Sequence, residues 1–118
     1  MAENLPTRTR RGQQRTPPPP VRSVELPDPP PHLTPEAQAM WTGIVEEWVL
    51  DAAALPLLQG ALEAWDQCQR CRAIVAEEGE TVTSPSGLPR SHPALKAGLD
   101  SFAAFRQAMR QLGLAPEV

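Results

Sequence analysis

Proline is distributed very unevenly along this chain of 118 residues. Nine of the fifteen prolines lie in residues 1–33, including the runs 17–20 and 29–31. This segment has almost no apolar periodicity, so it cannot bury enough surface to offset the entropy of ordering it. We therefore predict a disordered or polyproline-like arm, rich in proline and arginine, over residues 1–33 and a folded domain over residues 34–118.

The folded part is small and its charge differs from that of the arm. About 85 residues are a marginal size for a single hydrophobic core, which favours self-association. Residues 1–24 carry five arginines and one glutamate, whereas the remainder carries six basic and thirteen acidic residues, giving the net charge of −3. A basic arm on an acidic body suggests a polyanion as the partner of the arm, although a solubilising tail explains the charge equally well.

The chain lacks the signals of a membrane or secreted protein. No apolar run approaches the roughly 20 residues needed to span a bilayer. The N-terminus has no apolar segment of the kind found in secretory signals. We expect a protein of the cytoplasm with no membrane partner.

The body is expected to be all-α, with three main helices. The first begins at Thr34, a good N-cap, and its apolar residues recur at three- and four-residue spacing up to an end near residues 48–50. The third opens at Ser91 or His92 and carries one apolar face. It stops at Gly113, because glycine suits the left-handed position after a helix.

The second helix starts just after Asp51, or nearer Leu55 because a proline follows, and ends at Gly79. Its apolar face is too broad for one neighbour, so we expect it to be central and to leave surface for an oligomer contact. Residues 80–91 allow a short β-hairpin between helices two and three without requiring one. The residues expected in core or oligomer packing are Trp41, Trp48, Leu58, Leu62, Trp65, Phe102 and Phe105.

No arrangement of residues indicates catalysis. Cys68 and Cys71 form the only CxxC motif. A structural zinc site needs four ligands and a redox pair needs a helix N-terminus, whereas both cysteines fall in mid-helix on the apolar side. We interpret them as small core residues and His92 as a helix cap and loop anchor. We therefore expect no enzyme activity, no metal and no cofactor.

The arginines of the arm are the best candidates for contacts with nucleic acid, because guanidinium groups pair with phosphates without reading sequence. Contacts from one arm would be weak and sensitive to salt, but many arms in one ring would act together. The start of the third helix is expected to add contacts, since a helix N-terminus favours phosphate. The predicted DNA-binding residues are Arg8, Arg10, Arg11, Arg15, Arg90 and Lys96.

The order of several short motifs is informative beyond the separate helices. Leu-Thr-Pro-Glu at 33–36 precedes a tryptophan and a long helix ending in glycine, Ser-His-Pro-Ala-Leu stands at 91–95, and Leu-Gly-Leu-Ala-Pro stands at 112–116. This order, behind a basic proline-rich arm, resembles the small terminase subunits of tailed double-stranded-DNA bacteriophages. The resemblance covers residues 33–116.

The resemblance implies a helical protein that assembles into a homo-oligomeric ring of about 8 to 12 copies. It implies a packaging adaptor that recognises double-stranded viral DNA in the host cytoplasm. The adaptor presents this DNA to the large terminase subunit, which carries the ATPase and the nuclease. The small subunit modulates those activities and has no catalytic site of its own. Members vary in where they bind DNA, so the resemblance transfers no list of contact residues.

Two alternatives stay open. Residues 16–22 could dock into an aromatic groove as a polyproline helix, which would make the chain a helical protein-interaction module with a polyproline ligand arm. A helix-turn-helix regulator is less well supported, because the first helix carries three glutamates and no lysine or arginine. The mass of the native assembly would separate these alternatives from a ring.

Overall fold

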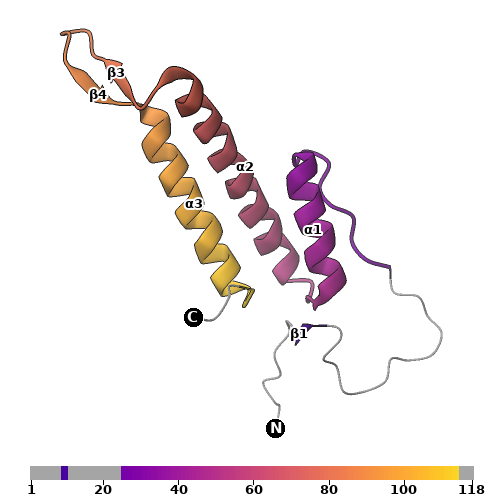
Figure 1. The fold of residues 1–118 in the computed structure, drawn as a ribbon. Helices are drawn as coiled ribbons and strands as arrows, with labels where there is room; N and C mark the ends of the chain where they lie inside the picture. Colours follow the sequence, from indigo (N-terminus) through magenta and orange to yellow (C-terminus); the bar gives the residue numbers. More distant parts are fainter. Residues whose placement is uncertain (1–8, 11–24, 115–118) are drawn as a thin grey trace, which may run out of the picture.

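The structure is a computed structural model that describes residues 9–10 and 25–114 (Figure 1). Its helices are α1 (Pro35–Glu47), α2 (Ala54–Glu78) and α3 (Pro93–Gln111). Its strands form two antiparallel pairs, β1 (Thr9–Arg10) with β2 (Trp48–Val49), and β3 (Thr81–Thr83) with β4 (Pro89–Ser91). A mostly helical body with three main helices is therefore confirmed for the described part of the chain. None of the described helices is long and apolar enough to cross a membrane.

Helix α1 begins and ends for local reasons. The Thr34 hydroxyl accepts a hydrogen bond from the Ala37 N–H at 3.2 Å, and Pro35 takes the first position, where no N–H partner is lost. The helix ends at Glu47, slightly before the predicted interval 48–50. It ends there because Trp48 has extended backbone angles and enters β2. This strand pair is the one element that the sequence did not lead us to expect.

Helix α2 starts between the two predicted positions. The Asp51 carboxylate accepts a hydrogen bond from the Ala54 N–H at 2.9 Å. Pro56 therefore falls in the first turn, where backbone N–H groups have no partner within the helix. The helix ends at the predicted glycine: Gly79 has a φ of 92°, which side-chain-bearing residues rarely adopt.

The connection between α2 and α3 is the hairpin that the sequence allowed. Strand β3 pairs with β4 so that Val82 lies opposite Arg90. The Ser84 hydroxyl accepts a hydrogen bond from the Leu88 N–H at 3.1 Å and closes the turn. Gly87 supplies the positive φ, 89°, that the turn requires. Helix α3 follows at once, with His92 as its N-cap.

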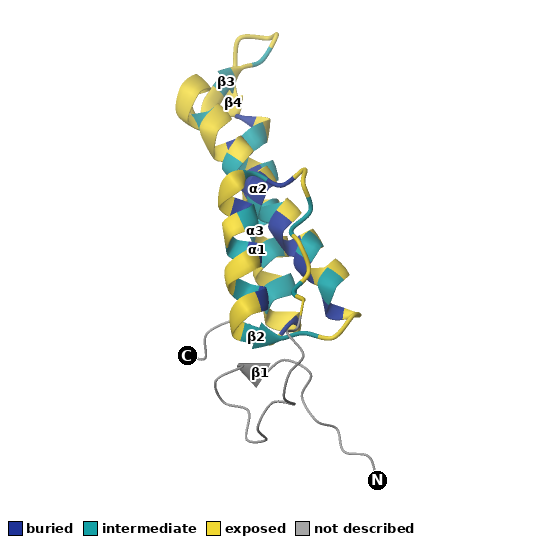
Figure 2. Cartoon of the chain, turned by 90° about the vertical axis from the view of Figure 1, so that its right-hand side faces the viewer, coloured by how far each residue is buried: buried dark blue, intermediate teal, exposed yellow. Residues whose placement is uncertain are grey.

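Helix α2 is central, as predicted, with α1 and α3 packed against it (Figure 1). One end of the body, residues 33–66 and 105–114, contains all three helices; we call it the closed end. It holds the core: Leu33, Ala37, Trp41, Val45, Ala54, Leu58, Leu62 and Leu112. Residues 67–104, the open end, consist of the rest of α2 and α3 with the β3–β4 hairpin at the tip. Figure 2 shows that the hairpin and much of the surface around it are exposed.

The residues expected in core or oligomer packing do not all lie in this core. Trp41, Leu58 and Leu62 are buried in it. Trp65 and Phe105 are partly buried against it. Two others are partly buried elsewhere: Trp48 in β2, and Phe102 on α3 with its ring centroid 6.0 Å from that of Phe105.

The last residues of the proline-rich arm contact the body. Residues 25–33 were expected to belong to a disordered or polyproline-like arm; they form no helix or strand, but they lie along the body. Leu33 is buried, Leu26 packs on the core, and the Trp41 indole Nε1 donates a hydrogen bond to the Pro27 carbonyl oxygen at 3.0 Å. Prolines have little conformational freedom to lose, and their carbonyl groups can accept bonds from side chains, so such a segment can pack without regular structure.

Candidate nucleic-acid interface

Most of the predicted arm contacts fall outside the described residues. This holds for Arg8, Arg11 and Arg15. The backbone of Arg10 belongs to β1 and lies opposite Trp48 of β2. The strand pair brings that short stretch of the basic segment next to the end of α1.

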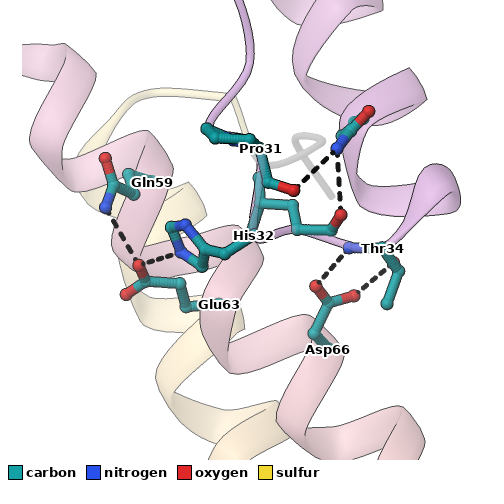
Figure 3. Close-up of polar contacts among 8 residues, drawn as sticks. Pro31, His32, Thr34, Gln59, Glu63 and Asp66 are labelled. Carbon is teal, nitrogen blue, oxygen red and sulfur yellow. Dashed lines mark hydrogen bonds and ion pairs between the residues drawn. The ribbon is translucent and has the colours of Figure 1, made fainter.

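A buried carboxylate of α2 holds Thr34, the residue before α1 (Figure 3). Asp66 of α2 is only 3% exposed. Its two oxygens accept hydrogen bonds from Thr34, one from the backbone N–H at 3.0 Å and one from the hydroxyl at 2.6 Å. A buried charge is tolerated when it is hydrogen-bonded in this way. Sequence reasoning missed Asp66, although its position four residues after Leu62 and eight after Leu58 placed it on the buried stripe.

A second, exposed contact lies beside it (Figure 3). The His32 Nε2 atom is 2.7 Å from Glu63 Oε2, and Gln59 donates a hydrogen bond to the same oxygen at 3.0 Å. The bond from Gln59, followed by that with His32, holds the pKa of the Glu63 carboxyl below its ordinary value. The contacts of His32 and Thr34 thus fix the segment before α1 against α2.

The two predicted contacts near α3 differ in their surroundings. Arg90 is exposed on β4. The Lys96 Nζ atom is 2.8 Å from Asp100 Oδ2, and this hydrogen bond raises the pKa of Lys96. Lys96 is thus charged but already paired with a carboxylate, which weakens it as a phosphate ligand. The structure does not join Arg90 and Lys96 through a common partner among the described residues.

His92 is held as a cap, in agreement with its interpretation from sequence. Its Nδ1 atom accepts a hydrogen bond from the Ala94 N–H at 3.0 Å, and its Nε2 atom lies 2.7 Å from Glu78 Oε1. Because Nδ1 accepts, the hydrogen-bond partner of Glu78 is the other ring nitrogen, whose Nε2–H donates to the carboxylate. The His92 backbone N–H also donates to the Glu80 carbonyl oxygen at 2.8 Å. One residue thus ties together α2, the hairpin and α3.

The cysteines are packing residues, as their positions in the sequence indicated. Cys68 and Cys71 are unpaired and buried. Gly98 of α3 lies against them: a Cβ atom at that position would be 3.0 Å from the Cys71 Cβ. The described residues contain no cluster of three or more side chains able to hold a metal ion.

Sequence reasoning missed one basic cluster altogether. The guanidinium carbon of Arg72, from α2, lies 5.3 Å from the centroid of the Phe102 ring, and that of Arg106, from α3, lies 5.6 Å from it. The spacing from Phe102 to Arg106, one helical turn, was a usable signal. The sequence carried no such signal for Arg72, because its contact with Phe102 depends on how α2 and α3 pack.

Comparison with known proteins identifies the body. A family model described as phage terminase, small subunit, matches residues 37–118, which is the larger part of the chain. No curated protein and no solved structure gave a match. The matched region begins inside α1 and includes α2, the hairpin and α3, so it covers most of the body that the structure describes. The resemblance seen in the motifs is confirmed, and the chain belongs to the family of phage terminase small subunits.

Proposed function

We propose that this protein is a non-catalytic adaptor for packaging viral DNA. In this role a homo-oligomeric ring recognises double-stranded viral DNA, presents it to the large terminase subunit and modulates the ATPase and nuclease of that subunit. The observation that carries the proposal is the family match over residues 37–118. The described residues support the non-catalytic part of this role. His92, the one buried histidine among them, caps α3 and bonds to Glu78 of α2.

The distribution of apolar surface supports assembly. The open end leaves Leu99 66% exposed, and Ile74 40% exposed. A groove runs there between the two helices, lined by Cys71, Arg72, Val75, Ala76, Ala94, Leu95, Gly98 and Leu99. Apolar surface of this kind is a common contact site between copies of a chain. A native mass measurement tests the ring, and a stable monomer at micromolar concentration would overturn it.

The charge of residues 1–24 supports DNA binding by the arm. The arginines in this segment include Arg8, Arg10, Arg11 and Arg15, against a single glutamate. Contacts between arginine and phosphate release counterions, so the logarithm of the binding constant falls with the logarithm of salt concentration by about 0.9 per contact. We expect the arm to raise both the affinity and this slope.

The experiment compares three forms of the native assembly on one double-stranded fragment across a salt series. These are the full chain, a chain lacking residues 1–24, and a chain in which the five arginines of that segment are replaced by glutamine. The last form keeps the proline run, so it separates charge from polyproline docking. Loss of affinity and slope in both altered forms supports the arm. Equal affinity and equal slope in all three would exclude it.

A further inference from the structure

Two arginines share one aromatic ring on the surface of the α2–α3 pair. The guanidinium carbons of Arg72 and Arg106 lie 5.3 and 5.6 Å from the centroid of Phe102. Phe102 is itself anchored, because it is partly buried and stacks on Phe105 with 29° between the ring planes. A ring held in this way restrains both guanidinium groups through cation–π contact.

The two arginines have no polar partner within the part of the chain that the structure describes. A guanidinium has five N–H donors, and the groups at Arg72 and Arg106 donate to none of the described residues and form no ion pair with them. The other described cations nearby differ. Arg70 donates a hydrogen bond to Gln67 at 2.8 Å, and Lys96 pairs with Asp100. The in-plane donors of Arg72 and Arg106 are therefore available to a ligand.

The shared ring sets an upper limit on the distance between the two guanidinium groups. Both distances run to the same centroid, so the guanidinium carbons cannot lie further apart than these two distances added, about 11 Å. At that upper limit the two charges are largely screened from each other, because the Debye length is about 8 Å at physiological ionic strength. An anion that contacts both groups would take up their unused donors.

The charges of the body are segregated in a way that favours the same surface. Helix α1 carries three glutamates and no basic residue, whereas α3 carries Lys96, Arg106 and Arg110 against Asp100. Arg110 lies one turn beyond Arg106 on the same face of α3 and is exposed. Arg106 and Arg110 on the second half of α3 and the neighbouring Arg72 thus lack a carboxylate partner among the described residues, as do Arg70 on α2 and Arg90 on β4.

We propose that Arg72 and Arg106, held over Phe102 and extended by Arg110, form a binding site for the phosphate backbone of DNA on the folded body. The inference rests on the proposed function and adds a second contact region to the arm. Guanidinium suits this ligand because its planar fork matches two phosphate oxygens. Contacts of this kind position the duplex without reading its bases. The body site would hold DNA along α3, while the arms add affinity from many copies.

The test uses the native assembly of the full chain and its double variant R72Q/R106Q. Affinity for a double-stranded fragment is measured across a salt series by fluorescence anisotropy. We expect the variant to lose affinity at least tenfold at low salt, and its salt slope to fall by about 0.9 for each arginine removed per engaged subunit. R70Q is the matched control: it removes an exposed arginine of the same helix that already has a partner, and affinity should change little. Circular dichroism and native mass are recorded for every variant.

The possible outcomes distinguish a failure of the phosphate site on the body from a failure of the proposed adaptor function. If R72Q/R106Q binds with unchanged affinity and slope while the arm variant binds more weakly, the body site is refuted and the adaptor role stands. If the unaltered protein binds no DNA under any salt condition, both are refuted. If R72Q/R106Q changes the native mass but leaves DNA affinity intact, the two arginines contact an acidic protein surface instead, and the phosphate site is overturned. A loss of affinity and slope at unchanged mass supports it.

Discussion

The closed end and the open end of the body are held together by different means. At the closed end three helices enclose fully buried side chains such as Leu58 and Leu62, and Asp66 fixes the start of α1. At the open end two helices meet through the close approach of Gly98 and the bonds of His92. A pair of helices has one interface and exposes the rest of its apolar side chains. The closed end can thus be stable within one chain, whereas the open end leaves apolar side chains such as Leu99 exposed.

The largest expected effect tests this difference in burial. The substitution L62A removes a side chain that is 0% exposed and leaves a cavity, so we expect a loss of about 2–5 kcal/mol in the free energy of unfolding. Its counterpart L99A alters a side chain that is 66% exposed, and we expect a change within about 0.5 kcal/mol for the isolated chain. Urea denaturation at one protein concentration measures both.

Repeating the measurement at higher protein concentration sharpens the comparison. If copies cover the open end, L99A becomes more destabilising as the concentration rises, because assembly stabilises the folded state by mass action. L62A should cost the same amount throughout. Equal losses for the two variants at a concentration where the chain is monomeric would contradict the distinction between the ends.

The close approach of α2 and α3 gives the next effect. The substitution G98A places a Cβ 3.0 Å from that of Cys71, so the helices must separate slightly, and we expect a loss of about 1–3 kcal/mol. Gly60 is the control, because nothing lies within 4 Å of a Cβ built there. G60A should stabilise by about 0.5–1 kcal/mol, since alanine is the better helix former. A neutral or stabilising G98A, measured by thermal unfolding, would show that the helices do not meet this closely.

A smaller effect is expected where α3 begins. H92A removes the acceptor for the Ala94 N–H and the bond to Glu78, and the loss of an N-cap costs about 1 kcal/mol. H92N keeps a good capping group but is too short to reach the carboxylate, so it separates the two contributions. Hydrogen exchange of the β3–β4 amides should rise in both variants if the tie to α2 holds the hairpin. Exchange that stays at the unaltered rate would assign His92 to capping alone.

Local and distant interactions differed in how well the sequence predicted them. The start at Thr34, the stop at Gly79 and the cap at His92 follow from bonds within a few residues, and the structure places all three where they were expected. The bonds of Asp66 join residues 32 positions apart, and Arg72 meets Phe102 from another helix. Such contacts depend on how the helices pack, which periodicity does not specify.

Packing between segments also limited what could be predicted for the arm. Composition predicted a disordered or polyproline-like segment through residue 33, because prolines and polar residues bury little surface. Residues 25–33 are nevertheless held by Trp41 and by the burial of Leu33. The receiving surface is formed by residues distant in sequence, so nothing within the segment itself could have indicated this.

The smallest predicted effect concerns the exposed contact beside Asp66 at the closed end. The pKa of Glu63 is lowered in the folded chain, so its ionised form stabilises the fold. This contribution is fully present above the ordinary carboxyl pKa, near 4.5, and is lost as pH falls through the lower pKa of the folded state. It should amount to a few tenths of a kcal/mol, because the side chain is 45% exposed.

Denaturation of E63Q and the unaltered protein between pH 7 and pH 3 should show a difference that disappears at the acid end. Q59A should show the same trend, since Gln59 gives the largest cause of the shift. A difference that persists unchanged at pH 3 would mean that Glu63 acts through packing and not through its charge.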